Sequence, residues 1–359
     1  MGAGLSGLSC ALTLEKHGIA PIVFESRNQV GDRFVNGEIL LSILSRPVTD
    51  SIAYFANDHS IFLQPASNIK KMFLYSAKEE ALIEGNLGFV TVRGRDYDSL
   101  ENQLVRQYKG EIIFNSKYSY EQLLQDFTHV VVATGDAAYA DKIQIFNTDL
   151  TVTLRGATVE GLFQRSTVMA WLNNFFAPQG YCYLIPFSER EANIVIAYPD
   201  YPENRKYDIN ILWDSFFQDV CMRLNQNLRV TDRFEITHYM IGTCRFPRIG
   251  NTFFTGNCFG SVMPFLGFGQ FAAILTGIYA AHDLCGKGDY AQLTKSLQQS
   301  YKNSLVLRRI MESLNNQQFD TVVRYLNSSL GQKLFNSTRL DVMKVASYLL
   351  RPMAGFKKN

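Results

Sequence analysis

The sequence predicts an α/β protein in which a Rossmann-like dinucleotide-binding domain holds an inserted antiparallel β-sheet and is followed by a helical C-terminal region. Three observations lead to this fold class. A glycine motif at the start of the chain runs into a helix, helix–strand units flank a block of alternating strands, and the residues from Tyr290 onward follow a mainly helical pattern.

The amino-acid composition limits the classes of protein to which the chain can belong. The 359 residues are 47% hydrophobic and 19% charged, which is typical of a globular chain of two domains. Lys and Arg number 35 against 33 Asp and Glu, and this balance argues against a nucleic-acid binder. The start of the chain does not resemble a signal peptide, and the sequence has no apolar run long enough to span a membrane, so we expect a cytoplasmic protein. Six cysteines without zinc-ligand spacing indicate buried thiols and no metal site.

The first motif is Gly2-Ala3-Gly4-Leu5-Ser6-Gly7. In a dinucleotide site the first glycine makes a tight turn, the second lets the backbone approach the pyrophosphate, and the third lets helix and strand pack closely. A helix over 5–17 follows, ended by Gly18, and then a strand over 19–24 that runs into Glu25. An acid about 20 residues beyond the glycines is placed to accept the hydroxyls of a ribose.

The strand that should precede this motif is missing, because only Met1 stands before Gly2. The predicted parallel sheet therefore lacks its first strand. Two explanations stay open: the true start lies upstream of the one given, which we favour because the rest of the motif is intact, or the protein is a truncated and inactive version.

The remaining elements follow in order. An extended segment over 81–92 is followed by a helix that opens at Asp96 or Asp98, a short strand over 111–114 and a buried parallel strand over 128–135. Alternating segments between 149 and 198 predict antiparallel strands, and helices are expected over 208–224 and 270–284. We assign 1–50, 80–145 and 235–285 to the dinucleotide-binding domain, 51–79 and 146–234 to a substrate domain, and 286–359 to the helical region.

Several segments, in the same order along the chain, resemble the FAD-dependent oxidoreductases that include p-hydroxybenzoate hydroxylase and the geranylgeranyl reductases, with a glutathione-reductase-like FAD fold. The matching segments are 2–25, 92–100, 133–135, 255–260 and 264–269, while 180–187 and 192–197 resemble the substrate strands of the geranylgeranyl reductases. The resemblance implies that FAD is the cofactor. It also implies that the helix starting near Gly269 faces the pyrimidine edge of the flavin, where its N–H groups favour the reduced anion.

One position departs from the family pattern. The family has an aspartate where this chain has Asn257, and an amide keeps a hydrogen bond to a ribityl hydroxyl but loses the charge-assisted one. The residues expected to bind the cofactor are Gly2, Gly4, Leu5, Ser6, Gly7, Glu25, Ser26, Arg33, Arg93, Ala133, Thr134, Gly135, Gly256, Asn257, Pro264, Gly267 and Gly269. Tyr183 and Pro186 are expected near the substrate, and Tyr183 is a candidate proton donor by location alone.

The leading functional hypothesis is hydride transfer between FAD and an apolar organic substrate, isoprenoid or quinone-like, with electrons from NAD(P)H or a donor protein. The reductase-like middle segments and the 26 Phe and 18 Tyr favour such a substrate. One alternative is a monooxygenase that hydroxylates an aromatic compound. Another is a degenerate flavoprotein that binds without turnover, which Asn257 and the missing strand favour. The amphipathic segment 342–350, flanked by Arg351 and Lys357-Lys358, indicates either peripheral membrane contact or a packing helix with a solvated tail.

Overall fold

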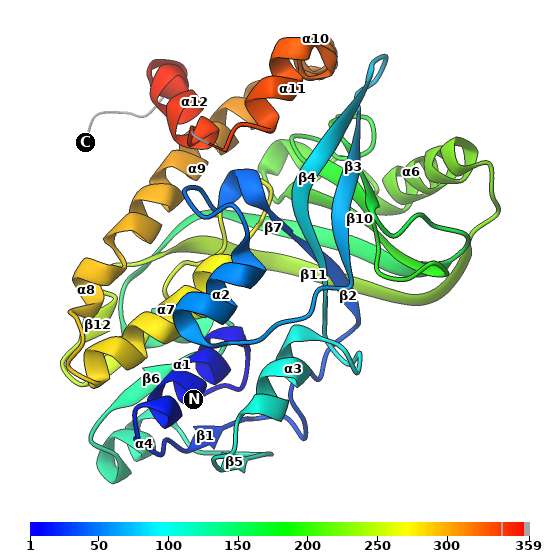
Figure 1. Ribbon diagram of the computed structural model, residues 1–359. Coiled ribbons are helices and arrows are strands. Elements are labelled where there is room, and N and C mark those ends of the chain that lie inside the picture. Colours follow the sequence, from blue (N-terminus) through cyan, green and yellow to red (C-terminus); the bar gives the residue numbers. More distant parts are fainter. Residues whose placement is uncertain (339, 355–359) are drawn as a thin grey trace.

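A large curled sheet with helices on its flanks dominates the computed structural model, which describes residues 1–338 and 340–354 (Figure 1). The eight strands of this sheet lie in the order β11-β7-β10-β9-β8-β3-β4-β2. Neighbours are antiparallel except for β3 and β8, which run parallel. The strands are β2 (Asn36–Leu41), β3 (Ser67–Tyr75), β4 (Glu80–Arg93), β7 (Phe146–Glu160), β8 (Thr167–Trp171), β9 (Tyr181–Pro186), β10 (Glu191–Pro199) and β11 (Arg229–Cys244).

The helices lie in several places around this sheet (Figure 1). One group gathers near the chain's first residues, α6 lies on the far side of the sheet, and α9 leads up to α10, α11 and α12. The helices are α1 (Leu5–Lys16), α2 (Ser51–His59), α3 (Leu100–Gln107), α4 (Tyr120–Asp126), α5 (Ala137–Ile143), α6 (Ile209–Leu224), α7 (Gln270–Leu284), α8 (Tyr290–Leu293), α9 (Lys295–Ser313), α10 (Asn316–Asn327), α11 (Ser329–Phe335) and α12 (Val342–Leu350). Four 3₁₀ turns are η1 (Ser42–Leu44), η2 (Pro202–Asn204), η3 (Gly256–Cys258) and η4 (Arg351–Met353). The predicted α/β class with a helical C-terminal region is confirmed.

The predicted parallel sheet is present in two pieces joined by the first two residues. β1 (Val23–Phe24) pairs in parallel with β5 (Ile112–Ile113), while β6 (Val130–Val132) pairs in parallel with β13 (Thr252–Phe254), which is flanked by β12 (Arg248–Ile249). The Met1 amino group donates to the Val131 carbonyl at 2.9 Å, and the Gly2 N–H donates to the Phe24 carbonyl at 2.7 Å. Met1 and Gly2 thus stand in the position of a central strand between β6 and β1.

Several boundaries differ from the sequence predictions, and β6, at Val130–Val132, is shorter than the predicted 128–135. β1 has only two residues instead of the predicted 19–24, because β5 offers just two partners and Pro21 has no N–H to donate. β5 is likewise two residues long rather than four. The helix α3 is capped by Ser99, whose hydroxyl accepts from the Asn102 N–H, and not by Asp96 or Asp98. The Asp96 carboxylate instead accepts from the Asp98 N–H in the turn before the helix.

The antiparallel block between 149 and 198 is confirmed, since β10 pairs antiparallel with both β7 and β9. The proposed division into domains remains a prediction. The large sheet takes β2 and β4 from segments assigned to the dinucleotide-binding domain, and β3 and β7 to β10 from those assigned to the substrate domain. All six cysteines are free thiols, four of them buried. No helix within 1–338 or 340–354 combines the length and apolar character needed to cross a bilayer.

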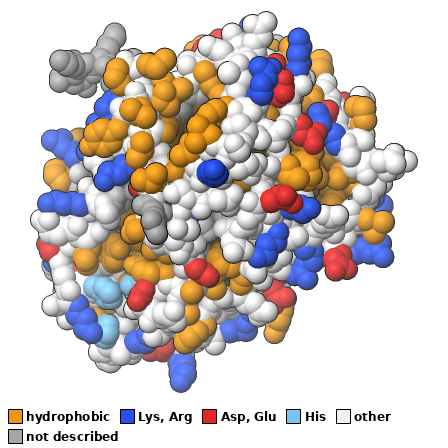
Figure 2. All heavy atoms as spheres, turned by 45° about the horizontal axis from the view of Figure 1, so that its top comes forward, with side chains coloured by type: hydrophobic (Ala, Val, Ile, Leu, Met, Phe, Trp, Pro, Cys, Tyr) orange, Lys and Arg blue, Asp and Glu red, His pale blue; other side chains and the backbone are white. Residues whose placement is uncertain are grey.

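Histidines gather on one part of the surface (lower left in Figure 2), where the C-terminal ends of α1, α2 and α7 meet. The ring of His282 lies 6.3 Å from that of His17 and 6.1 Å from that of His59, measured between centroids. Burial lowers the pKa of His59 and His282 below the ordinary value, and the neighbouring histidine and lysine charges lower both further. Protonation is therefore less favourable in the folded than in the unfolded chain.

We expect stability to fall as the pH drops from 7 to 5. Because the folded-state pKa of these histidines is depressed, their contribution is complete above the ordinary pKa of 6.5 and is lost as protonation is forced below it. A His59→Gln/His282→Gln variant should show a flatter dependence of the unfolding free energy on pH, measured by urea titration. His129→Gln, at an exposed position, is the control and should keep the wild-type slope. An unchanged slope in the double variant would contradict the assignment.

Candidate functional site

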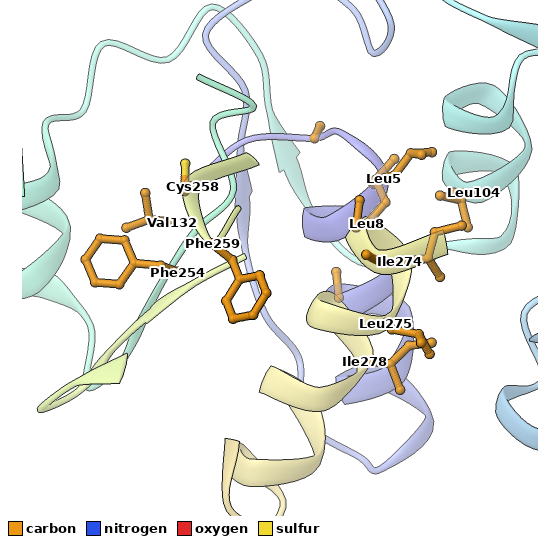
Figure 3. Packing of buried hydrophobic residues seen from close by; sticks show 14 of the residues in the cluster. Leu5, Leu8, Leu104, Val132, Phe254, Cys258, Phe259, Ile274, Leu275 and Ile278 are labelled. Carbon is orange, nitrogen blue, oxygen red and sulfur yellow. The ribbon is translucent and has the colours of Figure 1, made fainter. Parts of the chain in front are cut away.

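Two helices far apart in the sequence, α1 and α7, pack side by side (Figure 3). Leu8 of α1 lies beside Ile274 of α7, in a buried apolar cluster that also holds Leu5, Leu275 and Ile278. The Ser9 hydroxyl of α1 donates to the Ile274 carbonyl at 3.1 Å. Gly277 permits this approach, since a Cβ at that position would overlap the Ser6 carbonyl oxygen. The two helices are therefore held in a fixed mutual register.

The N-termini of α1 and α7 open into the same cavity and carry no side-chain cap. Their N-cap residues are Gly4 and Gly269, whereas α2, α3, α6, α10 and α12 are each capped by an Asp, Ser or Asn side chain. The first N–H groups of a helix have no partner within the helix, and they carry a partial positive charge. Two such ends meeting at one cavity make a place for an anionic or strongly dipolar ligand.

The glycines of the first motif divide into two kinds. A side chain at Gly2 would overlap the Ala133 carbonyl, and one at Gly7 would overlap the Gly2 carbonyl, so both serve close packing. Gly4 has no atom within 4 Å of a Cβ built on it and lines the cavity. Gly135, at φ +72°, is open in the same way. This geometry matches the roles expected of the three glycines in a dinucleotide loop.

Glu25 sits directly beside this loop. Its carboxylate accepts hydrogen bonds from the Ala3 N–H at 2.8 Å and from the Arg27 N–H at 2.9 Å. The Ser26 hydroxyl donates to the same carboxylate at 3.3 Å. Glu25 therefore fixes the end of β1 against the glycine loop.

A charged cluster lies where β2 and β4 pass the N-terminus of α7. Arg93 Nε donates to Glu101 Oε1 at 2.7 Å, while Arg93 and Arg33 each lie 3.4 Å from a Glu38 oxygen. The first side chain of α7, Gln270, donates to Glu38 Oε2 at 2.6 Å. Burial alone would raise the pKa of Glu38, but the charges of Arg93 and Arg33 outweigh it and lower that pKa. The cluster thus holds an ionised carboxylate at the helix end.

Asn257, in η3, bridges two parts of the cavity wall. Its amide donates to the Gly135 carbonyl at 3.0 Å and to the Tyr239 hydroxyl of β11. Burial raises the pKa of Tyr239 to about 12, so the phenol stays protonated at neutral pH. The Asn257 amide therefore holds the loop after β6 against the large sheet.

The cavity extends from the glycine loop into an apolar part, which we call the chamber, between the large sheet and helices α9 to α12. The whole cavity measures about 710 Å³. Chamber-lining side chains from the sheet include Leu41, Met72, Val168 and Ile185, and those from the helices include Met311, Phe319, Leu326, Phe335, Val342 and Leu350. Such a lining suits an organic ligand with little polar surface.

Two tyrosines of β9 face this chamber. The rings of Tyr181 and Tyr183 stack with centroids 5.8 Å apart. The Tyr181 hydroxyl donates to the Leu266 carbonyl at 2.5 Å and so holds the loop that carries Gly267. Burial raises the pKa of Tyr183 well above its ordinary value, and its hydroxyl makes no hydrogen bond to another described residue. Tyr183 can therefore donate a proton but not abstract one at neutral pH.

Most of the residues singled out from the sequence meet at this cavity. Those that line it are Gly4, Leu5, Ser6, Arg33, Arg93, Ala133, Gly135, Tyr183, Gly256, Asn257, Pro264, Gly267 and Gly269. Those outside its lining are Gly2, Gly7, Glu25, Ser26, Thr134 and Pro186. The role of each of these residues in cofactor binding, inside or outside the lining, remains a prediction. Among the lining residues that the sequence analysis did not single out are Phe34, Glu38, Tyr239 and Gln270. Of these only Gln270 carried a signal, as the first helical residue after Gly269.

Comparisons with known proteins agree with this arrangement. A family model of the NAD(P)-binding Rossmann-like domain matches residues 1–38, and no curated protein sequence matches the chain. Among solved structures, a geranylgeranyl bacteriochlorophyll reductase-like protein from Thermoplasma acidophilum superposes with a TM-score of 0.72 at 14% identity, covering 98% of this chain and 96% of that one. A flavin-dependent brominase gives 0.66 at 14%, with coverages of 98% and 96%. Aklavinone-11 hydroxylase, in a complex with FAD and aklavinone, gives 0.58 at 14%, with coverages of 93% and 71%. The chain therefore has the fold of these flavoproteins.

Proposed function

We propose that the protein binds FAD across the N-termini of α1 and α7 and exchanges a hydride between it and an apolar organic substrate in the chamber. The observation that carries the proposal is the continuity of one cavity of about 710 Å³, which joins two uncapped helix ends to an apolar chamber. FAD supplies two-electron hydride chemistry, and the chain supplies position, field and exclusion of water.

The residues present fit such a cofactor. Gly4 leaves open space beside the α1 N-terminus, where a pyrophosphate meets unpaired N–H groups. Glu25 would accept the ribose hydroxyls, and Gly267 leaves room for a planar ring near the α7 N-terminus. The same N–H groups would stabilise negative charge on that ring. Asn257 would contribute a neutral hydrogen bond, which is weaker than that of a carboxylate.

The names of the structural neighbours support redox chemistry with a flavin, since they include a reductase-like protein, a brominase and a hydroxylase. The reductase function is favoured here by the chamber, which is lined largely by aliphatic and aromatic carbon. Electrons would come from NAD(P)H that binds transiently or from a donor protein. Hydroxylation of an aromatic substrate is the second candidate, because aklavinone-11 hydroxylase shares the fold.

Tyr183 is the proton source we expect for reduction of a carbon–carbon double bond, where one carbon receives the hydride and the other a proton. A Tyr183→Phe variant should lower kcat for substrate reduction about 100-fold, because a positioned general acid contributes roughly that factor or more. FAD binding should be unchanged. Tyr198→Phe, which removes another hydroxyl from the cavity lining, is the matched control and should retain wild-type kcat. Equal rates in wild-type and Tyr183→Phe protein would remove Tyr183 from the mechanism.

The experiment that tests the function begins with an absorbance spectrum and a calorimetric titration with FAD. Bound flavin that is released by heat and identified as FAD supports the cofactor. The reduced protein is then mixed anaerobically with isoprenoid alkenes or quinones, and reoxidation of the flavin with formation of the saturated product or the hydroquinone supports the reductase. Turnover that needs oxygen and an aromatic substrate would identify a monooxygenase. A folded protein that takes up no FAD would reject the enzyme and favour a binding protein without turnover.

A further inference from the structure

The helix α12 is apolar on two opposite sides. Val342, Met343, Ala346 and Leu350 line the chamber. Val345, Tyr348, Leu349 and, in the following η4 turn, Met353 point to solvent, and we call these four residues the docking face. Leu349 is 75% exposed and Met353 73%, values that are unusual for large apolar side chains. A helix that packed only against its own protein would carry polar residues on its outer side.

Hydrophobic side chains gather in this part of the surface (upper left in Figure 2), over α12 and its neighbours. Leu330 of α11 and Leu340, just before α12, are 56% and 52% exposed and extend the apolar surface. The exposed apolar side chains of this region thus come from α11, the segment before α12, α12 and η4.

Basic residues surround the docking face. Lys333, Lys344 and Arg351 are exposed, and none forms an ion pair with another described residue. The Arg351 guanidinium lies 5.2 Å from the Tyr348 ring centroid, so this charge sits at the edge of the apolar surface. The adjacent acid, Asp341, is occupied as the N-cap of α12, where it accepts from the Lys344 N–H.

The charge of the chain is divided unequally. Residues 329–359 contain six Lys or Arg and one Asp, a net charge of +5, whereas the other 328 residues contain 29 basic and 32 acidic residues, a net charge of −3. These two values give the overall +2. Lys357 and Lys358, which lie outside the described residues, belong to this basic segment. Positive charge is therefore concentrated in the segment that carries the docking face.

We propose that α12 docks the protein on an anionic lipid bilayer, with the docking face in the headgroup–acyl boundary and the basic residues against the lipid phosphates. An interfacial helix combines exposed apolar side chains with flanking lysine and arginine, and α12 has both. Attraction between clustered positive charge and an anionic surface favours a bilayer over a second copy of the chain, since two copies would bring +5 against +5.

The docking does not depend on flavin and goes beyond the proposed function. Because α12 is at once a wall of the chamber and the docking face, bilayer contact would place the chamber next to the acyl chains. An apolar substrate dissolved in lipid suits this placement, and that last step alone rests on the proposed function.

The test is co-sedimentation of the full chain with vesicles of phosphatidylcholine, with and without phosphatidylserine. Wild-type protein should partition to the anionic vesicles, and salt should weaken the binding. Leu349→Ser/Met353→Ser should lower the partition coefficient about tenfold or more, because the burial of two large apolar side chains is lost. Lys344→Gln and Arg351→Gln should each lower it about fivefold on anionic vesicles and leave neutral ones unchanged.

The matched control is Ile211→Ser/Met222→Ser, which removes two equally exposed apolar side chains from α6 and should bind vesicles as wild type does. All variants are checked for unchanged melting temperature. Failure of wild-type protein to bind anionic vesicles would overturn the proposal. So would a dimer, seen by light scattering, that the Leu349→Ser/Met353→Ser substitutions dissociate, because a second copy would then cover the face. Neither result bears on FAD uptake, which is measured without lipid.

Discussion

A Gly4→Ala variant should retain the melting temperature of the wild-type protein and lose about 10- to 100-fold in FAD affinity. Gly4 adopts φ −85° and ψ −171°, an extended conformation open to any residue, and nothing lies within 4 Å of the added methyl group. The methyl would project into the cavity at the uncapped end of α1 and displace a phosphate from the N–H groups there. Losing one such charge-assisted hydrogen bond costs about 1.5–3 kcal/mol, and about 1.4 kcal/mol corresponds to a tenfold change.

Gly7→Ala, three residues further along, provides the contrast. Its methyl group would overlap the Gly2 carbonyl inside the packed turn, so we expect a loss of stability of about 1–3 kcal/mol. Calorimetric titration with FAD and thermal unfolding, measured on both variants, separate a blocked site from a damaged fold. Wild-type FAD affinity in folded Gly4→Ala protein would show that no ligand approaches this helix end.

The second large effect is expected at Arg93. The side chain of Glu101 is only 3% exposed. Its carboxylate lies 2.7 Å from Arg93 Nε, whereas the nitrogen of Arg33 is 3.9 Å away. Arg93→Ala would leave a buried carboxylate without its partner, which typically costs about 3–5 kcal/mol. The same change removes a charge that lowers the pKa of Glu38. The free energy of unfolding by urea is the measurement.

Two further variants make this test specific. Arg95→Ala is the matched control, because the Arg95–Asp32 pair is 2.9 Å long but the arginine is 61% exposed, and such pairs contribute at most about 1 kcal/mol. Arg93→Met/Glu101→Leu should recover much of the lost stability, since it removes both charges and refills the space. A loss in Arg93→Ala no larger than that in Arg95→Ala would refute the buried ion pair.

The stability that Glu38 contributes to this cluster should decrease as the pH becomes acidic. Because the folded-state pKa of Glu38 is below its ordinary value of 4.5, its stabilising contribution is complete above that value. It is lost as the pH falls through the lowered pKa. Glu38→Gln protein should therefore lose less stability than wild type between neutral and strongly acidic pH.

Local patterns predicted those elements whose signals lie within a single segment. The glycine loop, α6 and the apolar helix α7 all follow from spacing along the chain. The length of β1 did not, because a strand is only as long as its partner allows, and its partner β5 is nearly 90 residues away. Sequence alone could not place Glu38, since its neighbours Arg93 and Gln270 come from other segments. The sequence did not predict the chamber for the same reason, because α10 to α12, which form part of its wall, are far along the chain from the strands of the sheet that form the rest.

The packing of α1 against α7 affects when the protein can complete its folding during synthesis. The Ser9–Ile274 hydrogen bond joins positions 265 residues apart, and the open helix ends meet only when both helices are in place. During synthesis the glycine loop leaves the ribosome well before its partner helix, which lies 265 residues further along the chain. A nascent chain stalled before residue 270 would thus expose the apolar side of α1, which chaperones recognise. Flavin uptake would then report completed assembly rather than early folding.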